Sequence, residues 1–338
     1  MTTRRLFLKS ATALAALPLA ASVAAQTAEP TRVVATFSIL GDMVERIGGE
    51  HVVVTTLVGP DGDTHVYRPT PADARAVSGA EILVVNGLEF EGWLERMAEA
   101  AAFDGALAVA TTGIEPIAFE DDHGHGHEDH GDDRAGSDHD RDHDEKAHTP
   151  DEDHAGHEDH GHGAFDPHAW QSLANAVTYV DNIAAALAQA DPDNATVFYR
   201  NRAAYVAEIA ALDTEIRALM AALPEDRRTI VTPHDAFQYF GRDYGLTFLA
   251  PQGLSTESEA SARDVARLIE RIRDQGISAV FLENITDGRL LEQIANETGA
   301  TIGGTLHPGA LSGPDGPAPT YLDMMRHNAT TIARALGA

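Results

Sequence analysis

Histidine is the residue type through which this chain could do chemistry, because neutral imidazole is the commonest protein ligand for metal ions. The sequence holds 17 histidines and no cysteine, so disulfides, thiolate metal sites and cysteine nucleophiles are excluded. Eleven histidines lie within residues 120–162 and the other six are spread along the chain. Those six are His51, His65, His168, His234, His307 and His327.

Three of the six stand in turns with distinctive neighbours: His65 in GPDGDTHVYRPTP (59–71), His168 in DPHAW (166–170) and His234 in TPHDAF (232–237). His65 and His234 each follow a predicted strand, and open α/β sheets bind ligands beyond the carboxyl ends of their strands. A lone loop histidine is usually an ordinary surface residue, so the inference depends on all three together. Three converging imidazoles would suit Zn²⁺.

Carboxylates stand close in sequence to these histidines, at Asp63, Asp166 and Asp235. A metal-bound histidine usually gives its other ring proton to a carboxylate or carbonyl group. The same residues could instead cap helices or form turns, and the sequence does not choose between these roles.

Residues 120–162 carry 17 Asp or Glu against 3 Lys or Arg, nearly half of the chain's net charge of −29. Such a stretch buries too little apolar surface to order itself, so we expect residues 120–164 to form a disordered loop. It could be a plain solvated linker, but the run His-Gly-His-Gly-His at 123–127 favours a low-affinity zinc collector. The acidic balance excludes nucleic acid as a partner.

The elements that must position these residues alternate between strand and helix patterns in both halves of the chain. The expected strands are Arg32–Phe37, Val52–Val58, Ile82–Val85, Arg228–Val231, Leu246–Leu249, Ala279–Leu282 and Thr301–Thr305. The expected helices are Ile39–Ile47, Pro71–Ser78, Trp93–Ala101, Gln171–Gln189, Asn194–Leu223, Ala236–Tyr244, Ser261–Gln275, Gly288–Thr298 and Pro319–Leu336.

This alternation predicts an α/β fold with mainly parallel sheets, in two lobes of the usual domain size. The helix expected over 194–223 is unusually long and would form a rigid rod joining the lobes. The expected organisation is an N-terminal lobe over 26–192, a linking helix over 193–223 and a C-terminal lobe over 224–338.

The first 25 residues are typical of a twin-arginine signal peptide. Arg4 and Arg5 precede an apolar run from Ala11 to Ala25, which is short for a membrane span, and cleavage would fall before Gln26. A membrane anchor is the alternative. With no cysteine to carry a lipid, we expect a soluble periplasmic protein.

Several motifs together resemble the zinc and manganese class of solute-binding proteins of ABC importers. They are FSILGD (37–42), RPTPAD (68–73), NGLEFE (86–91), DPHAW (166–170), HDAFQYF (234–240) and the segment 313–321. The resemblance implies two α/β lobes joined by one long helix, with His65, His168 and His234 as ligands of a metal ion between the lobes. It further implies a monomer that docks on an inner-membrane ABC permease; a zinc metallochaperone is a second candidate partner.

The resemblance also bears on the choice of metal and on the fourth ligand. Imidazole favours zinc and oxygen ligands favour manganese, and the position that is a carboxylate in manganese-type relatives is His234 here. The aspartate usual in the family after the last strand is replaced by Gly309. His307, two residues earlier, would point the same way in an extended chain, and we take it as the candidate fourth ligand.

Other fourth ligands stay open: water, a histidine of the loop, or a carboxylate such as Glu257, Glu259 or Glu283. Three histidines plus water would also describe a catalytic zinc, but no HExxH, GxSxG or P-loop pattern supports an enzyme. We therefore expect a zinc receptor and no catalysis. A periplasmic zinc buffer and a manganese receptor are the alternatives.

Overall fold

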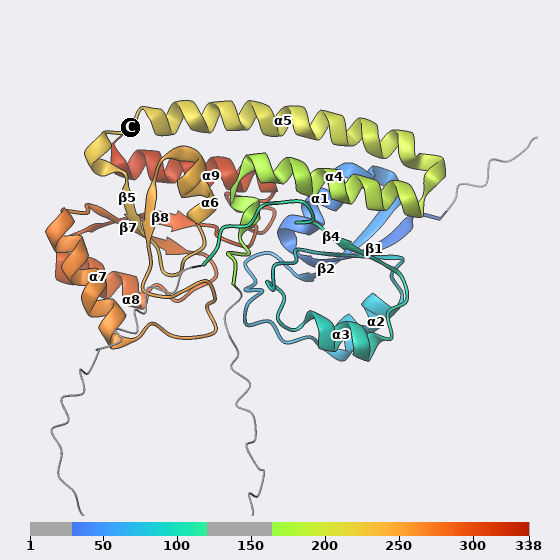
Figure 1. Ribbon diagram of the computed structural model, residues 1–338, viewed down its shortest axis with the longest axis horizontal. Helices are drawn as coiled ribbons and strands as arrows, with labels where there is room; N and C mark the ends of the chain where they lie inside the picture. Colours follow the sequence, from blue (N-terminus) through green and yellow to red (C-terminus); the bar gives the residue numbers. More distant parts are fainter. Residues whose placement is uncertain (1–28, 120–163, 338) are drawn as a thin grey trace, which may run out of the picture.

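Two four-stranded parallel sheets form the frame of the computed structural model, which describes residues 29–119 and 164–337. The first has the order β2-β1-β3-β4 and the second β6-β5-β7-β8 (Figure 1). Their strands are β1 (Thr31–Phe37), β2 (Val52–Val58), β3 (Ile82–Val85), β4 (Ala106–Val109), β5 (Thr229–Val231), β6 (Thr247–Leu249), β7 (Ala279–Glu283) and β8 (Thr301–Leu306). The sheets define a first and a second lobe, as the alternating pattern predicts.

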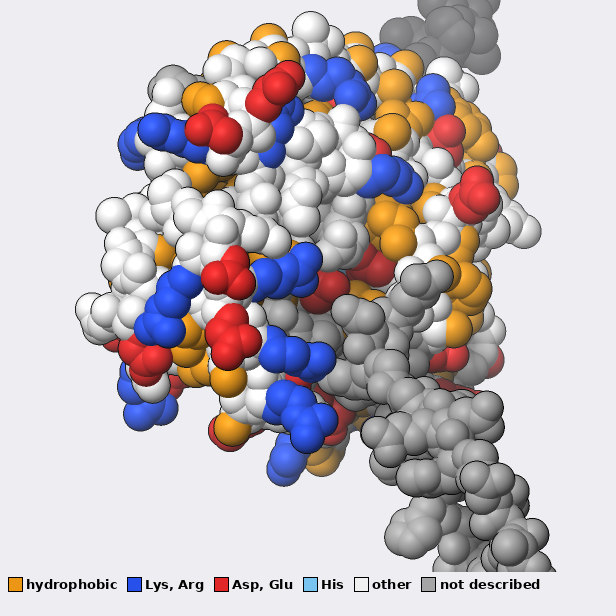
Figure 2. All heavy atoms as spheres, turned by 60° about the vertical axis from the view of Figure 1, so that its left-hand side comes forward, with side chains coloured by type: hydrophobic (Ala, Val, Ile, Leu, Met, Phe, Trp, Pro, Cys, Tyr) orange, Lys and Arg blue, Asp and Glu red, His pale blue; other side chains and the backbone are white. Residues whose placement is uncertain are grey.

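Helices cover the sheets and connect them. They are α1 (Ser38–Gly48), α2 (Pro71–Ser78), α3 (Leu94–Ala101), α4 (Leu173–Ala190), α5 (Ala195–Ala221), α6 (Gln238–Tyr244), α7 (Ala262–Gln275), α8 (Arg289–Thr298) and α9 (Tyr321–Leu336). None of the helices in the described part of the chain is both long enough and apolar enough to span a membrane. On the face carrying α7 and α8, arginine and carboxylate side chains are interspersed (Figure 2).

Helix α5 is the long helix expected from the sequence, with 27 residues. It runs along one side of the molecule past both sheets, and α4 and α9 lie beside it (Figure 1). Its buried side chains form one stripe: Phe198, Tyr205, Ile209, Leu212, Ile216 and Met220. Since a continuous α-helix resists bending, α5 fixes the spacing of the two lobes.

Strand β4 is the element that the sequence pattern missed. It has four residues, Ala106–Val109, with exposed side chains at Ala106 and Leu107. Alanine has low strand propensity and no alternating pattern develops over so short a stretch. Pairing with the buried strand β3 therefore decides its conformation.

The core continues across the seam between the lobes around Trp170. Its ring packs against Phe37 and Phe90 of the first lobe, with centroids 5.0 and 4.7 Å apart. Its indole nitrogen donates to the Pro308 carbonyl at 2.8 Å, after β8 of the second lobe. Trp170 therefore fixes the segment that carries His168 against both lobes.

Two predictions fall outside the described residues. These are the signal peptide over 1–25 and all but the last residue of the loop expected over 120–164. The described chain stops at Phe119 and resumes at Ala164, where Phe119 N–H donates to the Ala164 carbonyl at 3.0 Å. Ala118 and Phe165 form an antiparallel bridge next to it. The described residues on either side of this gap therefore form a short stem.

Candidate metal centre

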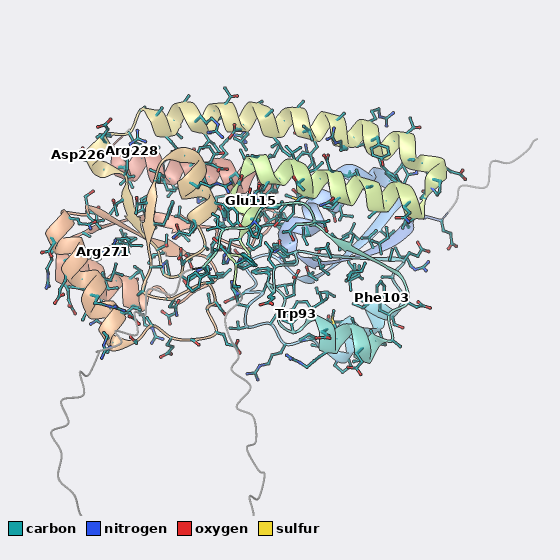
Figure 3. The ribbon with its side chains drawn as sticks, viewed as in Figure 1. Trp93, Phe103, Glu115, Asp226, Arg228 and Arg271 are labelled. Atoms are coloured by element: carbon teal, nitrogen blue, oxygen red, sulfur yellow. The ribbon has the colours of Figure 1, made fainter. Side chains whose placement is uncertain are left out.

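His65 lies in the turn that follows β2. Its backbone N–H donates to Asp63 Oδ1 at 2.9 Å, and Thr256 Oγ1 of the second lobe donates to Asp63 Oδ2 at 2.6 Å. The Trp93 indole nitrogen, at the start of α3, donates to the Thr64 carbonyl at 3.0 Å (Figure 3 labels Trp93). These bonds fix the turn from both lobes and so position the His65 ring.

His168 precedes the short 3-10 helix Ala169–Gln171 and is 1% exposed. Asp166 Oδ1 accepts from the backbone N–H of His168 at 2.9 Å and from its ring Nδ1 at 2.8 Å. When Asp166 is ionised it can only accept a hydrogen bond, so in that state Nδ1 carries the proton and Nε2 is left with a lone pair. Asp166 therefore performs the orienting role that its sequence position left open.

His234 follows β5 at the carboxyl edge of the second sheet and is fully buried. Its Nδ1 lies 2.6 Å from Glu283 Oε2, at the end of β7. Its Nε2 is buried and has no hydrogen-bond partner within the described residues. A buried, unpaired ring nitrogen is costly unless a ligand binds it.

The three rings converge on one another, although they come from distant parts of the chain. One ligand atom from each of His65, His168 and His234 lies within 4.8 Å of the other two. His65 Nε2 and His168 Nε2 are 3.2 Å apart. The ring centroids are 5.3 to 5.6 Å apart. Among the described residues, these three histidines form the group of three or more metal-ligand side chains whose ligand atoms lie this close together.

Burial and charge set the protonation of the group. Burial lowers the pKa of His65 and of His168 well below the usual value, and the neighbouring imidazoles act in the same direction. Burial would lower the pKa of His234 too, but the charge and hydrogen bond of Glu283 outweigh it and raise that pKa. Burial raises the pKa of Asp166 to about 7, against the hydrogen bond from His168. Two of the three rings are thus held neutral, which is the form that binds metals.

The structure brings three of the four predicted ligands together and leaves His307 apart. The His307 ring donates through Nδ1 to the Ala310 carbonyl at 3.1 Å and packs against His327, with centroids 5.3 Å apart. The short loop after β8 folds back on itself through this bond. The extended geometry from which we expected the His307 ring to reach the site therefore does not hold.

The carboxylates considered for the fourth position also lie outside the group. Glu283 bonds to His234, and Glu257 and Glu259 are exposed. A Cβ added at Gly309 would meet Trp170 Cζ2 at 3.5 Å, an ordinary contact. Space for a side chain therefore exists where the family resemblance expects an aspartate.

Comparison with protein families gives a match to zinc-uptake complex component A, periplasmic, over residues 33–335. The chain belongs to this family. Members of the zinc-uptake component A family are solute-binding proteins of ABC importers, not enzymes, which confirms both the resemblance and the non-enzymatic expectation.

Relatives of this chain are named for different metals. The iron-binding protein YfeA of Yersinia pestis is 31% identical over 319 residues, covering 94% of this chain and 90% of the relative. The manganese-binding lipoprotein MntA of Bacillus subtilis is 32% identical over 311 residues, covering 90% and 89%. Membership in the zinc-uptake component A family therefore does not by itself choose the metal.

Solved structures agree with the fold. A manganese-bound periplasmic metal-binding protein from Candidatus Liberibacter asiaticus matches with a TM-score of 0.72 and 29% identity, over 90% of this chain and 99% of that one. The periplasmic zinc-binding protein TroA from Treponema pallidum matches with a TM-score of 0.76 and 26% identity, over 91% and 100%. Two parallel sheets and a long helix are thus the architecture of the zinc-uptake component A family.

Proposed function

We propose that this protein is a zinc receptor that captures Zn²⁺ in the periplasm and delivers it to an inner-membrane ABC permease. His65, His168 and His234 are the ligands. The observation that carries the proposal is the all-nitrogen donor set of three imidazoles, two buried and one partly buried, with His234 Nε2 unpaired. Zinc favours such ligands and tetrahedral sites, whereas manganese favours oxygen.

The wider arrangement supports delivery to a membrane importer. Relatives of this chain are named as substrate-binding lipoproteins of metal ABC transporters, among them SsaB of Streptococcus sanguinis. Residues 1–25 would be a twin-arginine signal that exports the protein to the periplasm, and a zinc metallochaperone remains a second candidate partner.

The stem of the acidic, histidine-rich segment lies next to the site. Asp166 N–H donates to the Ile117 carbonyl at 2.9 Å, and Tyr239 O–H donates to the Asp166 carbonyl at 2.9 Å. Asp166 is the carboxylate that holds His168, so the described residues that flank the segment lie beside a proposed ligand. This placement favours a segment that collects zinc over a plain linker.

A competition titration with a zinc chelator tests the proposal. The wild type should hold one zinc ion tightly, and more tightly than manganese. Replacing His65, His168 or His234 by Ala should weaken zinc binding by at least about tenfold, or about 1.4 kcal/mol.

His51→Ala is the matched control, because the His51 ring packs against Phe198 of α5, away from the three-histidine group. Its zinc affinity should equal that of the wild type. Undiminished affinity in all three site variants would reject the site, and tighter binding of manganese would reject zinc as the cargo. A series of weak sites without a tight one would favour the buffer alternative.

A further inference from the structure

Two histidines outside the proposed site share a cavity of about 540 Å³. Its lining includes Asp61, His307 and His327. His307 follows β8, His327 lies on α9, and Asp61 belongs to the same turn as His65. The cavity thus lies where the first lobe meets the second, and Asp61 N–H donates to the Leu311 carbonyl at 2.8 Å across this contact.

Backbone carbonyls fix which nitrogen of each ring carries the proton. His307 Nδ1 lies 3.1 Å from the Ala310 carbonyl, and His327 Nε2 lies 3.0 Å from the Thr305 carbonyl. A carbonyl only accepts, so these two nitrogens donate. In the neutral rings, His307 Nε2 and His327 Nδ1 are left with lone pairs. A histidine anchored in this way is oriented as metal-binding histidines usually are.

The two rings pack edge to face. Their centroids are 5.3 Å apart and their planes are 86° apart. Burial lowers the pKa of His307 below its usual value, and the nearby His327 lowers it further, against the Ala310 bond and the Asp61 charge. His307 is therefore neutral at physiological pH and its lone pair is available.

We propose that His307 Nε2 and His327 Nδ1 bind a second divalent cation of the zinc class, with water completing its coordination. With two imidazoles in place of three, this cation binds more weakly than the one in the three-histidine site.

Two measurements on the full-length protein test this second site. In crystals soaked in excess zinc, anomalous maps should show a peak at bonding distance, about 2.0–2.1 Å, from His307 Nε2 and His327 Nδ1. In equilibrium dialysis at the same zinc concentration, His327→Gln should bind one zinc ion fewer than the wild type. Glutamine keeps an amide that can donate to the Thr305 carbonyl.

His51→Gln is the matched control and should bind as much zinc as the wild type. Chelator competition should show the tight site unchanged in His327→Gln, which separates this proposal from that of the three-histidine site. The second site is refuted by the absence of the peak, by an unchanged zinc count in His327→Gln, or by a weakened tight site in that variant.

Discussion

A different carboxylate contact positions each histidine of the three-histidine site. These contacts are not equally predictable from the sequence. Asp166 stands two residues from His168 and Asp63 two residues from His65, so both could be suspected from spacing. Glu283 holds His234 from 49 positions away and was considered only as a rival ligand. Asp235, the sequence neighbour of His234, instead accepts from Gln238 at 2.5 Å. Only the fold reveals which carboxylate orients His234.

Replacing Glu283 by Gln should weaken zinc binding by about tenfold to a hundredfold, the usual effect of removing an outer partner of a metal-binding histidine. The amide keeps the shape of the side chain but loses the charge that favours Nδ1 as donor. Chelator competition measures the change. Glu215→Gln is the control, because Glu215 is exposed and pairs with Arg326. Equal affinities in the two variants would contradict the orienting role.

Gly309→Asp should restore a carboxylate at the site and raise manganese affinity by about tenfold, or about 1.4 kcal/mol, because manganese favours oxygen ligands. The new Cβ meets only an ordinary contact with Trp170. Gly92→Asp, where a Cβ would have no atom within 4 Å, adds the same charge as a control. If manganese affinity stays at the wild-type level in Gly309→Asp, position 309 does not face the ion.

At the scale of elements, α1 of the first lobe is joined to α9 of the second by a partly buried carboxylate. Asp42 Oδ2 accepts from the Tyr321 backbone N–H at 3.0 Å, at the start of α9. Burial raises the pKa of Asp42 to about 6 from 3.8, against the Tyr321 bond and the Arg46 charge. A raised pKa means that the folded chain binds this proton more tightly than the unfolded chain does. The contribution of Asp42 to stability is therefore greatest below pH 3.8 and is lost as the pH rises through about 6.

Asp42→Asn removes this ionisation but keeps an acceptor for Tyr321. The stability of the variant relative to the wild type should rise between pH 4 and pH 7 by about 2–3 kcal/mol, at 1.36 kcal/mol per pKa unit. Urea unfolding of the metal-free proteins at both pH values measures the difference. Asp104→Asn, at an exposed position, is the control. A relative stability of Asp42→Asn that does not change with pH would contradict the assignment.

Most elements could be predicted because their patterns are local. The strands around Val33 and Val280 are apolar runs bounded by turns, and Pro224 follows the long helix closely. Strand β4 was missed because only its neighbour makes it a strand. The placement of the His307 ring could not be predicted, because the Ala310 contact that turns the ring depends on a backbone conformation that spacing alone does not give.

At the scale of the whole molecule, the site lies where two sheets meet, and α5 runs past both of them. Sequence alternation predicted two lobes, and family resemblance implied that a metal lies between them. Neither could give the contacts across the seam, such as Thr256 with Asp63 and Asn284 with Asp61. These join residues about 200 positions apart, a separation over which no local pattern carries information.

Deleting residues 121–162 should leave one tight zinc site and reduce the total zinc bound. The tight ligands lie in the described lobes, and Phe119 and Ala164 already meet, so a short connection closes the gap. Chelator competition and equilibrium dialysis give the two quantities. Disappearance of the tight site together with the segment would show that the three histidines do not suffice.

The central claim is that imidazoles from three distant positions hold one divalent ion between the lobes. A crystal structure of the protein loaded with one equivalent of zinc, with anomalous data at the zinc edge, tests it most directly. We predict a single strong peak about 2.0–2.1 Å from the Nε2 atoms of His65, His168 and His234. A peak held by carboxylates alone, or rings that point away from the ion, would contradict the account.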